Sequence, residues 1–200
     1  VEEDGASYKM VNNETFFRGS NCVDIDFGPD GKLYISDYNY GGWLNQDVGN
    51  IYAMEVPGQI DEPEVAENEG ILVSDFAQYD VQELVGMLGR DHLQIRQKSQ
   101  FELAKRGRLG IEAFTRAATR TQLPTLVRIH GVWGLGQMAA NEGLSILEPL
   151  FDLLSDSNEQ VRIQSARVLG DLRVVKSAEL LVKALRDEHP RVAMYAGIGL

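Results

Sequence analysis

The sequence is poor in the residues that mark disulfide-stabilised or metal-binding proteins. It has one cysteine, Cys22, and three histidines in 200 residues. A single cysteine excludes an internal disulfide and a cysteine-rich metal site, and we expect Cys22 to be a packed thiol at the start of a strand. The histidines stand far apart, without the H-E-x-x-H spacing of a zinc enzyme. These residues therefore predict no metal site and no catalytic residue.

Long apolar runs are missing as well. No stretch approaches the ~18 apolar residues of a membrane span, and no secretory signal peptide is visible. The chain does not begin with Met, and its last ten residues have the pattern of a helix interior. We therefore expect a segment of a longer protein, without a membrane span of its own.

Basic residues are scarce in the first part of the chain. Residues 1–80 hold 17 Asp and Glu against 3 Lys and Arg, whereas residues 81–200 hold 13 against 16. Phosphate binding requires clustered Lys and Arg, so this balance argues against a nucleic acid as partner. Solubility explains the acidic surplus better than cation binding does.

Two short strands are predicted between Val23 and Tyr38. Val23, Ile25 and Phe27 alternate with aspartates, which is the pattern of a half-buried strand. The run Gly-Pro-Asp-Gly at 28–31 predicts a tight turn, and the β-rich residues 33–35 follow it. Residues 50–56 predict a third strand. A sheet this small is marginal alone, and radial repetition of such sheets is a propeller.

The segments DIDFGPDGKLYISD and GNIYAMEV carry a resemblance to a known family. With the loop between them, they resemble the last blade of glucose/sorbosone dehydrogenase-like β-propellers. More closely, they are similar to large secreted bacterial proteins of a membrane-bound dehydrogenase or haem-binding type. The resemblance covers about residues 16–56. It implies an extracytoplasmic location, periplasmic or secreted, and pyrroloquinoline quinone with calcium as cofactor. Any haem c would lie outside this segment, because C-x-x-C-H is absent.

One end of the blade is a candidate ligand face. Strands alternate in direction, so the connection at 18–21 and the long loop at 37–49 should lie together, opposite the turn at 28–31. In the resembled family this face binds the quinone and a sugar. The candidate cofactor-binding residues are Arg18, Asp37, Tyr40 and Trp43. The family's arginine pair is missing before Asp24, which speaks against quinone binding.

The sequence beyond the strands predicts helical repeats. Residues 57–79 form an acidic linker, with little regular structure expected over 57–76, and the helical period begins near residue 80. A β-branched residue recurs near successive helix starts at 95, 127, 161 and 192, with spacings of 32, 34 and 31. This period predicts an α-solenoid over 80–200, and it resembles HEAT-like repeats of the phycobilin-lyase type.

Two further features of the repeats are informative. An arginine follows the β-branched residue in three repeats, at Arg96, Arg128 and Arg162. Asp91, Asp156 and Asp187 precede these helices, and we expect them to act as N-caps that also bond the arginines of neighbouring repeats. Gly134 and Gly136 lie inside an apolar helix, which indicates close helix packing rather than a phosphate loop.

These observations leave two functions open, with a weaker third. The first is a binding and scaffolding segment of an extracytoplasmic oxidoreductase-like protein. Residues 1–56 would be the C-terminal part of a β-propeller, and the solenoid would bind a protein or another domain of the same protein. The second is part of a quinone-dependent sugar or polyol dehydrogenase that uses the 37–49 loop. A bilin lyase is suggested only by the repeat type.

Overall fold

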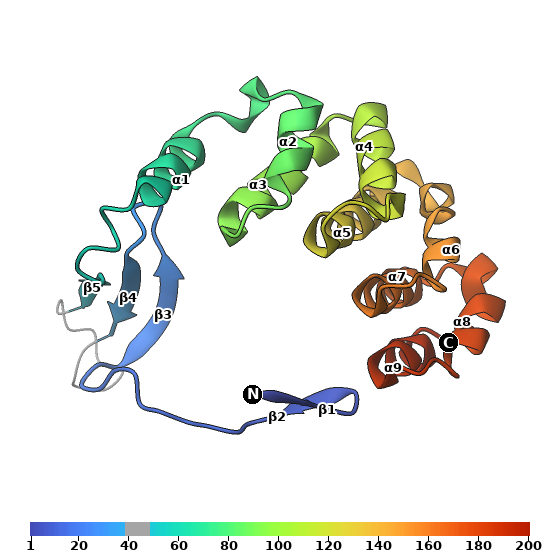
Figure 1. Cartoon of the computed structure of the whole chain (residues 1–200), viewed down its shortest axis with the longest axis horizontal. Coiled ribbons are helices and arrows are strands. Elements are labelled where there is room, and N and C mark those ends of the chain that lie inside the picture. The colour runs from blue at the N-terminus through green and yellow to red at the C-terminus, as the bar shows by residue number, and fades with distance from the viewer. Residues whose placement is uncertain (39–48) are drawn as a thin grey trace. The chain divides into compact units, whose positions relative to one another are not determined.

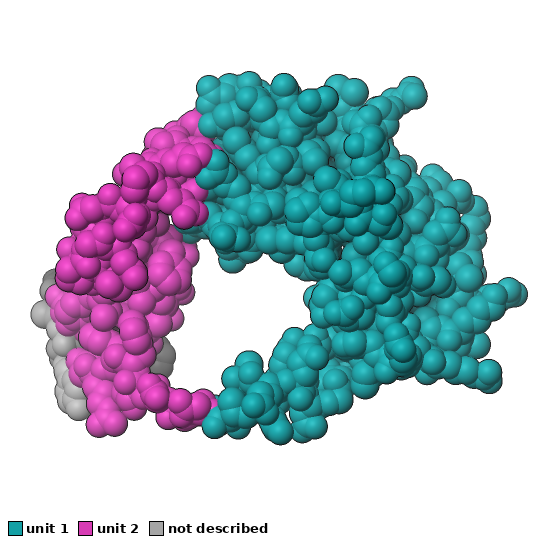
Figure 2. Space-filling view, in the orientation of Figure 1, with its two compact units in different colours: residues 1–11, 76–200 teal, residues 12–75 magenta. Residues whose placement is uncertain are grey.

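The chain forms two compact units. The computed structural model describes residues 1–38 and 49–200, and Figure 1 shows its elements in chain order. Unit 1 consists of residues 1–11 and 76–200, and unit 2 consists of residues 12–75 (Figure 2). Small antiparallel sheets are thus followed by helices, as the sequence predicts. In the described part of the chain, every strand ends before residue 55, which confirms that strands are confined to the first part.

Unit 2 contains the predicted sheet. Its strands are β3 (Cys22–Phe27), β4 (Leu33–Asp37) and β5 (Asn50–Met54), paired antiparallel in the order β3-β4-β5. The turn closes through the Gly28 N–H, which donates to the Lys32 carbonyl at 2.8 Å. Gly31 has a φ of +77°, a backbone conformation that residues other than glycine rarely adopt. The predicted hairpin is therefore confirmed.

One face of this sheet is apolar but only partly covered. Ile35 on the central strand is buried, whereas Ile25 and Phe27 on β3 are exposed. The Cys22 thiol is also exposed, so the expectation of a packed thiol is wrong. Cys22 misses the core because β3 is an edge strand whose residues are exposed along its whole length.

The acidic segment after the sheet contains helix α1 (Pro63–Val73). The expectation that 57–76 would have little regular structure is therefore wrong. Pro63 occupies the first turn, where a missing N–H costs nothing, and Glu64 complements the positive end of the helix. Val65 of α1 contacts the hairpin turn, since a Cβ added at Gly31 would lie 3.0 Å from a Val65 methyl carbon.

Unit 1 begins with a hairpin of β1 (Glu2–Asp4) and β2 (Ser7–Lys9). After the 3-10 turn η1 (Phe76–Gln78), it continues as α-helices with two further 3-10 turns. The helices are α2 (Val81–Met87), α3 (Leu93–Lys105), α4 (Arg108–Thr119), α5 (Thr125–Glu142), α6 (Leu150–Leu153), α7 (Glu159–Asp171), α8 (Ala178–Ala184) and α9 (Pro190–Ile198). The 3-10 turns are η2 (Leu144–Leu147) and η3 (Val175–Ser177).

These helices form two rows. Helices α3, α5, α7 and α9 lie side by side in one row, and we call them the row helices. Helices α2, α4, α6 and α8 form the second, outer row (Figure 1). The repeated β-branched residues Ile95, Val127, Val161 and Val192 are all buried. The recurring position is therefore a core position, as the spacing predicts.

The apolar stripe at 144–154 is divided between two short helices. Pro149 separates η2 from α6, because proline cannot continue the hydrogen-bonding pattern of the preceding turn. Leu147, Leu150 and Leu154 of this stripe are buried, whereas Leu144 is 44% exposed.

Glycines allow the row helices to approach closely. A Cβ at Gly134 would lie 2.4 Å from the Phe114 ring of α4, and one at Gly136 would lie 2.9 Å from Val168 of α7. Real Cβ atoms do not come this near to neighbouring side chains. The prediction that these glycines serve helix packing is confirmed.

Leu154→Ala should destabilise unit 1 by about 2–5 kcal/mol, because it removes buried methyl groups and leaves a cavity. Val161→Asp should be more damaging, since it places an unpaired carboxylate in a fully buried position. The free energy of unfolding measured by chemical denaturation tests both. Val182→Ala is the matched control, because Val182 is 53% exposed; equal stability of all the variants would show that the stripes are misassigned.

Candidate protein-binding face of the helical repeats

Buried arginines connect successive repeats. The Arg128 side chain is 3% exposed, and its Nη1 and Nη2 donate to the two carboxylate oxygens of Asp156 at 3.0 and 2.5 Å. Its Nε donates to the Ala118 carbonyl at 3.0 Å. The planar guanidinium thus binds the carboxylate of the next repeat at two points, the strongest geometry for such a pair.

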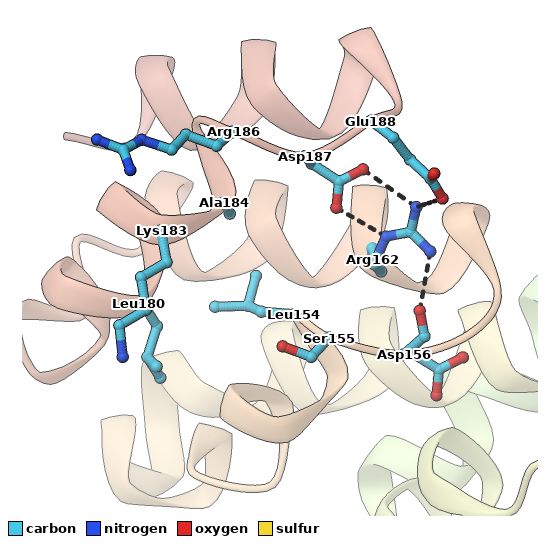
Figure 3. A pocket seen from close by; sticks show the side chains of 10 residues that line it. All are labelled: Leu154, Ser155, Asp156, Arg162, Leu180, Lys183, Ala184, Arg186, Asp187 and Glu188. Carbon is cyan, nitrogen blue, oxygen red and sulfur yellow. Dashed lines mark hydrogen bonds and ion pairs between the residues drawn. The ribbon is translucent and has the colours of Figure 1, made fainter.

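Arg162 makes the next connection, again with two bonds to one carboxylate but through the Nε and Nη2 edge of its guanidinium (Figure 3). Its Nε and Nη2 donate to the Asp187 carboxylate at 2.9 and 3.0 Å, and its Nη1 donates to the Asp156 carbonyl at 2.9 Å. In the last repeat Ala193 replaces the arginine. Arg191 instead pairs with Glu3 at 3.1 Å and stacks over the Tyr8 ring. We call the bonds Arg128–Asp156 and Arg162–Asp187 the arginine ladder.

The ladder corrects one expectation and confirms another. The N-caps of α3, α7 and α9 are His92, Asn158 and His189, so the aspartates do not cap these helices. Asp156 and Asp187 each lie two residues before the cap and accept the N–H of the cap residue. The expected bonds to arginines of neighbouring repeats are present for both.

The ladder keeps its carboxylates ionised. Burial by itself raises the pKa of Asp156, but the hydrogen bonds from Arg128 and the Asn158 N–H, with the Arg128 charge, outweigh burial. The pKa of Asp156 therefore lies below its ordinary value of 3.8. The pKa of Asp187 is lowered likewise: burial opposes the shift, and Arg162 and the His189 N–H overcome it.

A pocket of about 440 Å³ lies beside the second ladder bond (Figure 3). Leu154, Leu180 and Ala184 form its apolar part, and Arg162 and Asp187 lie on its polar side. These two charges already satisfy each other, and Glu188 adds a contact to Arg162 at 3.6 Å. The charged wall of this pocket is therefore structural.

The opposite side of the row helices presents a different set of residues. They stand three and six positions after each β-branched residue, so they share one helix face. We call this set the row face: Lys98, Phe101, His130, Trp133, Gln164, Arg167, Tyr195 and Ile198. Phe101 and Ile198 are exposed by 52% and 67%, and Trp133 is half-buried.

Contacts between neighbouring helices hold the row face in order. Trp133 Nε1 donates to Gln164 Oε1 at 2.9 Å, and the His130 ring packs edge-on against the indole with centroids 5.1 Å apart. One repeat further, the Arg167 guanidinium lies 5.8 Å from the centre of the Tyr195 ring. In the Trp133–Gln164 and Arg167–Tyr195 pairs, the residue six positions after one β-branched residue meets the residue three positions after the next.

A groove of about 410 Å³ opens beside Trp133 between α5 and α7. Trp133 and Arg167 line it together with Gln100, Val168 and Asp171. It offers an aromatic surface, an apolar floor and charges of both signs. Such a mixture suits a protein or peptide surface.

His130 is the buried member of the row face, and its imidazole is a neutral base. Its Nδ1 lies 2.8 Å from Gln100 Oε1, and burial together with the Arg96 charge lowers its pKa to about 4. Among the described residues, no group of three or more His, Cys, Asp or Glu is placed to hold a metal ion.

The predicted ligand-face residues lie in unit 2. The Asp37 carboxylate accepts the Asn21 N–H at 2.9 Å, which places the 18–21 connection and the end of β4 at the same end of the sheet, opposite the turn. Arg18 donates to the Thr15 hydroxyl at 3.3 Å. Tyr40 and Trp43 lie outside the described residues. Asp37 thus closes the sheet end, and a cofactor role for these four residues stays a prediction.

Sequence reasoning missed the row face because it looked for binding aromatics in the 37–49 loop. The repeat alignment contains the necessary information: Phe101, Trp133, Arg167 and Ile198 stand six residues after the four β-branched residues. A large side chain at a recurrent, uncovered helix position was the readable feature.

The fold and the ladder define a stack of helical repeats. The family model of HEAT repeats matches residues 111–200, from within α4 to residue 200. The expected similarity to HEAT repeats is confirmed over this range, and HEAT repeats stack into surfaces that commonly bind proteins. No curated protein matches the sequence. None of the helices in the described ranges is both long and apolar enough to cross a membrane.

Asp156→Asn should destabilise the repeats by about 3–5 kcal/mol at pH 7, because it leaves the buried Arg128 charge without its carboxylate. The pKa of the Asp156 carboxyl is lower in the folded than in the unfolded protein. The carboxylate therefore stabilises the fold at pH values above its unfolded-state pKa, and this stabilisation is lost as the pH falls through its folded-state pKa. The difference in the free energy of unfolding between wild type and Asp156→Asn should therefore become smaller below pH 3.8.

Urea unfolding at several pH values measures this gap. Asp152→Asn is the matched control, because Asp152 is exposed on the neighbouring helix. A variant as stable as wild type at neutral pH would contradict the structural role of the ladder.

Proposed function

We propose that the helical repeats bind a partner protein, or another domain of the same protein, through the row face. The observation that carries this proposal is that Phe101, Trp133, Arg167 and Ile198 occupy the same position on α3, α5, α7 and α9. Trp, Tyr and Arg dominate the binding energy of protein interfaces. The row face offers all three, and Trp133 and Arg167 line an open groove.

The fixed position of Trp133 supports a binding role. Its indole is oriented by the bond to Gln164 and by the His130 ring before any partner arrives. An anchor that is already ordered loses little side-chain entropy on binding. The buried core of the repeats, in contrast, supplies rigidity and a fixed spacing between helices.

Photo-crosslinking tests the proposal. A benzophenone amino acid in place of Arg167 should form adducts in the native host, whereas the same group in place of Lys183 on α8 should not. Trp133→Ala should reduce the Arg167 adduct at least tenfold, a loss of about 1.4 kcal/mol. Val182→Ala is the control for an apolar truncation on the outer row.

Circular dichroism would establish that the Trp133→Ala variant keeps its helices, and Phe101→Ser offers a second disruption of the face at an exposed position. Adduct masses separate a partner protein from another domain of the same protein. Adducts at Lys183 as strong as those at Arg167, or adducts that survive both row-face substitutions, would refute the proposal.

A finer proposal concerns unit 2. We infer that its sheet is a blade of a β-propeller in an extracytoplasmic oxidoreductase-like protein. The exposed edge strand β3 and the uncovered side chains of Ile25 and Phe27 support it, because such surfaces favour cover by neighbouring strands. The blade-like sequence of residues 16–56 supports it as well. A structure of the whole protein in which nothing covers this face would count against the blade.

The alternative role of this sheet is in a quinone-dependent sugar dehydrogenase. The Arg18 guanidinium donates to the Thr15 hydroxyl and the Asp37 carboxylate accepts the Asn21 N–H, so both groups already make bonds within the protein. We therefore expect no dye-linked turnover when the full-length protein receives pyrroloquinoline quinone, calcium and a panel of sugars. Turnover that falls on Arg18→Ala, with Lys9→Ala as an exposed control, would favour the dehydrogenase instead.

A further inference from the structure

The first arginine of the column occupies the same place in its repeat as the ladder arginines. Arg96 follows Ile95 as Arg162 follows Val161. In both, Nη1 donates to the carbonyl six residues earlier: Arg96 to Arg90 at 2.6 Å, and Arg162 to Asp156 at 2.9 Å. Arg96 Nη1 also donates to the Asp91 carbonyl at 2.7 Å. The two guanidinium groups are therefore oriented by the same loop contact.

The two guanidinium groups differ in whether their Nε and Nη2 atoms have a carboxylate acceptor. Nε and Nη2 of Arg162 hold the Asp187 carboxylate of the next repeat. Arg96 Nε is shielded from solvent and has no acceptor, and no carboxylate in the described ranges lies within ion-pair distance of Arg96. A planar guanidinium that is half-buried and bonded on one side only has an unfilled carboxylate position on the other.

The sequence explains why this position is unfilled. The residue aligned with Asp156 and Asp187 in the next repeat is Gln122, which stands 34 residues before Asp156. Its side chain is exposed and bears no charge. The ladder thus lacks its first carboxylate because the sequence has an amide at the place that supplies it.

Two histidines near Arg96 reflect the absence of a compensating anion among the described residues. His92 Nδ1 is shielded and has no partner, and burial and the Arg96 charge lower the pKa of His92. The same two causes lower the pKa of His130. Burial is the larger cause of both shifts, and a bound anion would offset only the part that the Arg96 charge contributes.

We propose that Arg96 binds a carboxylate of the partner protein through its Nε and Nη2. In Arg162, the same two atoms donate to the Asp187 carboxylate. The ligand is the side chain of an Asp or Glu, or the C-terminal carboxylate of a polypeptide. Each offers two coplanar oxygens that can accept two parallel hydrogen bonds from the Arg96 guanidinium. The proposal rests on the protein-binding function of the repeats. It adds the chemistry that the partner must supply at the first of these helices.

The side-chain Nε–Hε signals of ¹⁵N-labelled protein test the site without the partner. Two probes are titrated at constant ionic strength: N-acetylglycine, which imitates the terminal carboxylate of a polypeptide, and N-acetylaspartic acid amide, which imitates an acidic side group. N-acetylglycinamide is the uncharged control. Arg96→Lys identifies the Arg96 signal by its disappearance.

We expect a saturable shift of the Arg96 signal with one or both carboxylates and none with the amide. The probe that binds more tightly identifies the source of the carboxylate. The pKa of His92, followed in the same samples, should rise on binding, because the anion offsets the Arg96 charge. Absence of a saturable shift, or an equal response to the amide, would overturn the proposal.

Gln122→Asp should fill the site from within the protein. We expect it to weaken binding of both probes at least tenfold, and to raise the denaturation midpoint above that of Gln122→Asn, the uncharged control of the same shape. Probe binding to Gln122→Asp as strong as to wild type would overturn the proposal. Because no partner is present, this result is independent of whether crosslinking at Arg167 succeeds.

Discussion

A guanidinium cannot be buried between helices unless its charge and its donors are satisfied, and this requirement organises the repeats. Arg128 and Arg162 are almost fully enclosed, and each is matched by a carboxylate from the following repeat. The remaining bond of Arg128 goes to the Ala118 carbonyl in the last turn of α4, and that of Arg162 goes to the carbonyl of Asp156 in the loop before α7. Each arginine therefore ties its own helix to the segment before it and to a loop of the following repeat. The aspartates are themselves fixed by the N–H of the residue two positions on, so the loops cannot shift without exposing an unpaired charge.

Close packing within and between the two rows of helices depends on small residues as well as on this ladder. Gly134 lets the Phe114 ring lie against the α5 backbone, and Gly136 does the same for Val168. The short distance between α5 and α7 brings Trp133 within reach of Gln164. The geometry of the row face is thus a consequence of the core beneath it. The rigid core sets the spacing of these binding residues, and their contacts with one another fix their orientation.

The sequence predicted much of this architecture because each prediction rested on a local rule. The period of the β-branched residues identified the core positions, and Gly28 and Gly31 identified the hairpin turn. Helix α1 was missed because the acidic composition of residues 57–79 was taken to indicate a linker, although Pro63 is favourable in a first helical turn. Asp156 was expected to cap α7, but Asn158 stands closer to the helix and takes that role. Which side of each guanidinium is occupied depends on three-dimensional contacts that the spacing does not encode.

The comparison of Arg96 with Arg162 shows that one differing residue in a repeat can leave half of a contact in place. In a repeated structure every unit provides half of each contact, so a change in one unit leaves the other half in place. Gln122 removes the carboxylate, while the loop carbonyls of Arg90 and Asp91 still orient Arg96. The orientation that elsewhere stabilises the stack is retained here without its usual partner. A half-buried cation prepared in this way would select its ligand by charge and planarity, because the rest of its bonding is already fixed by the fold.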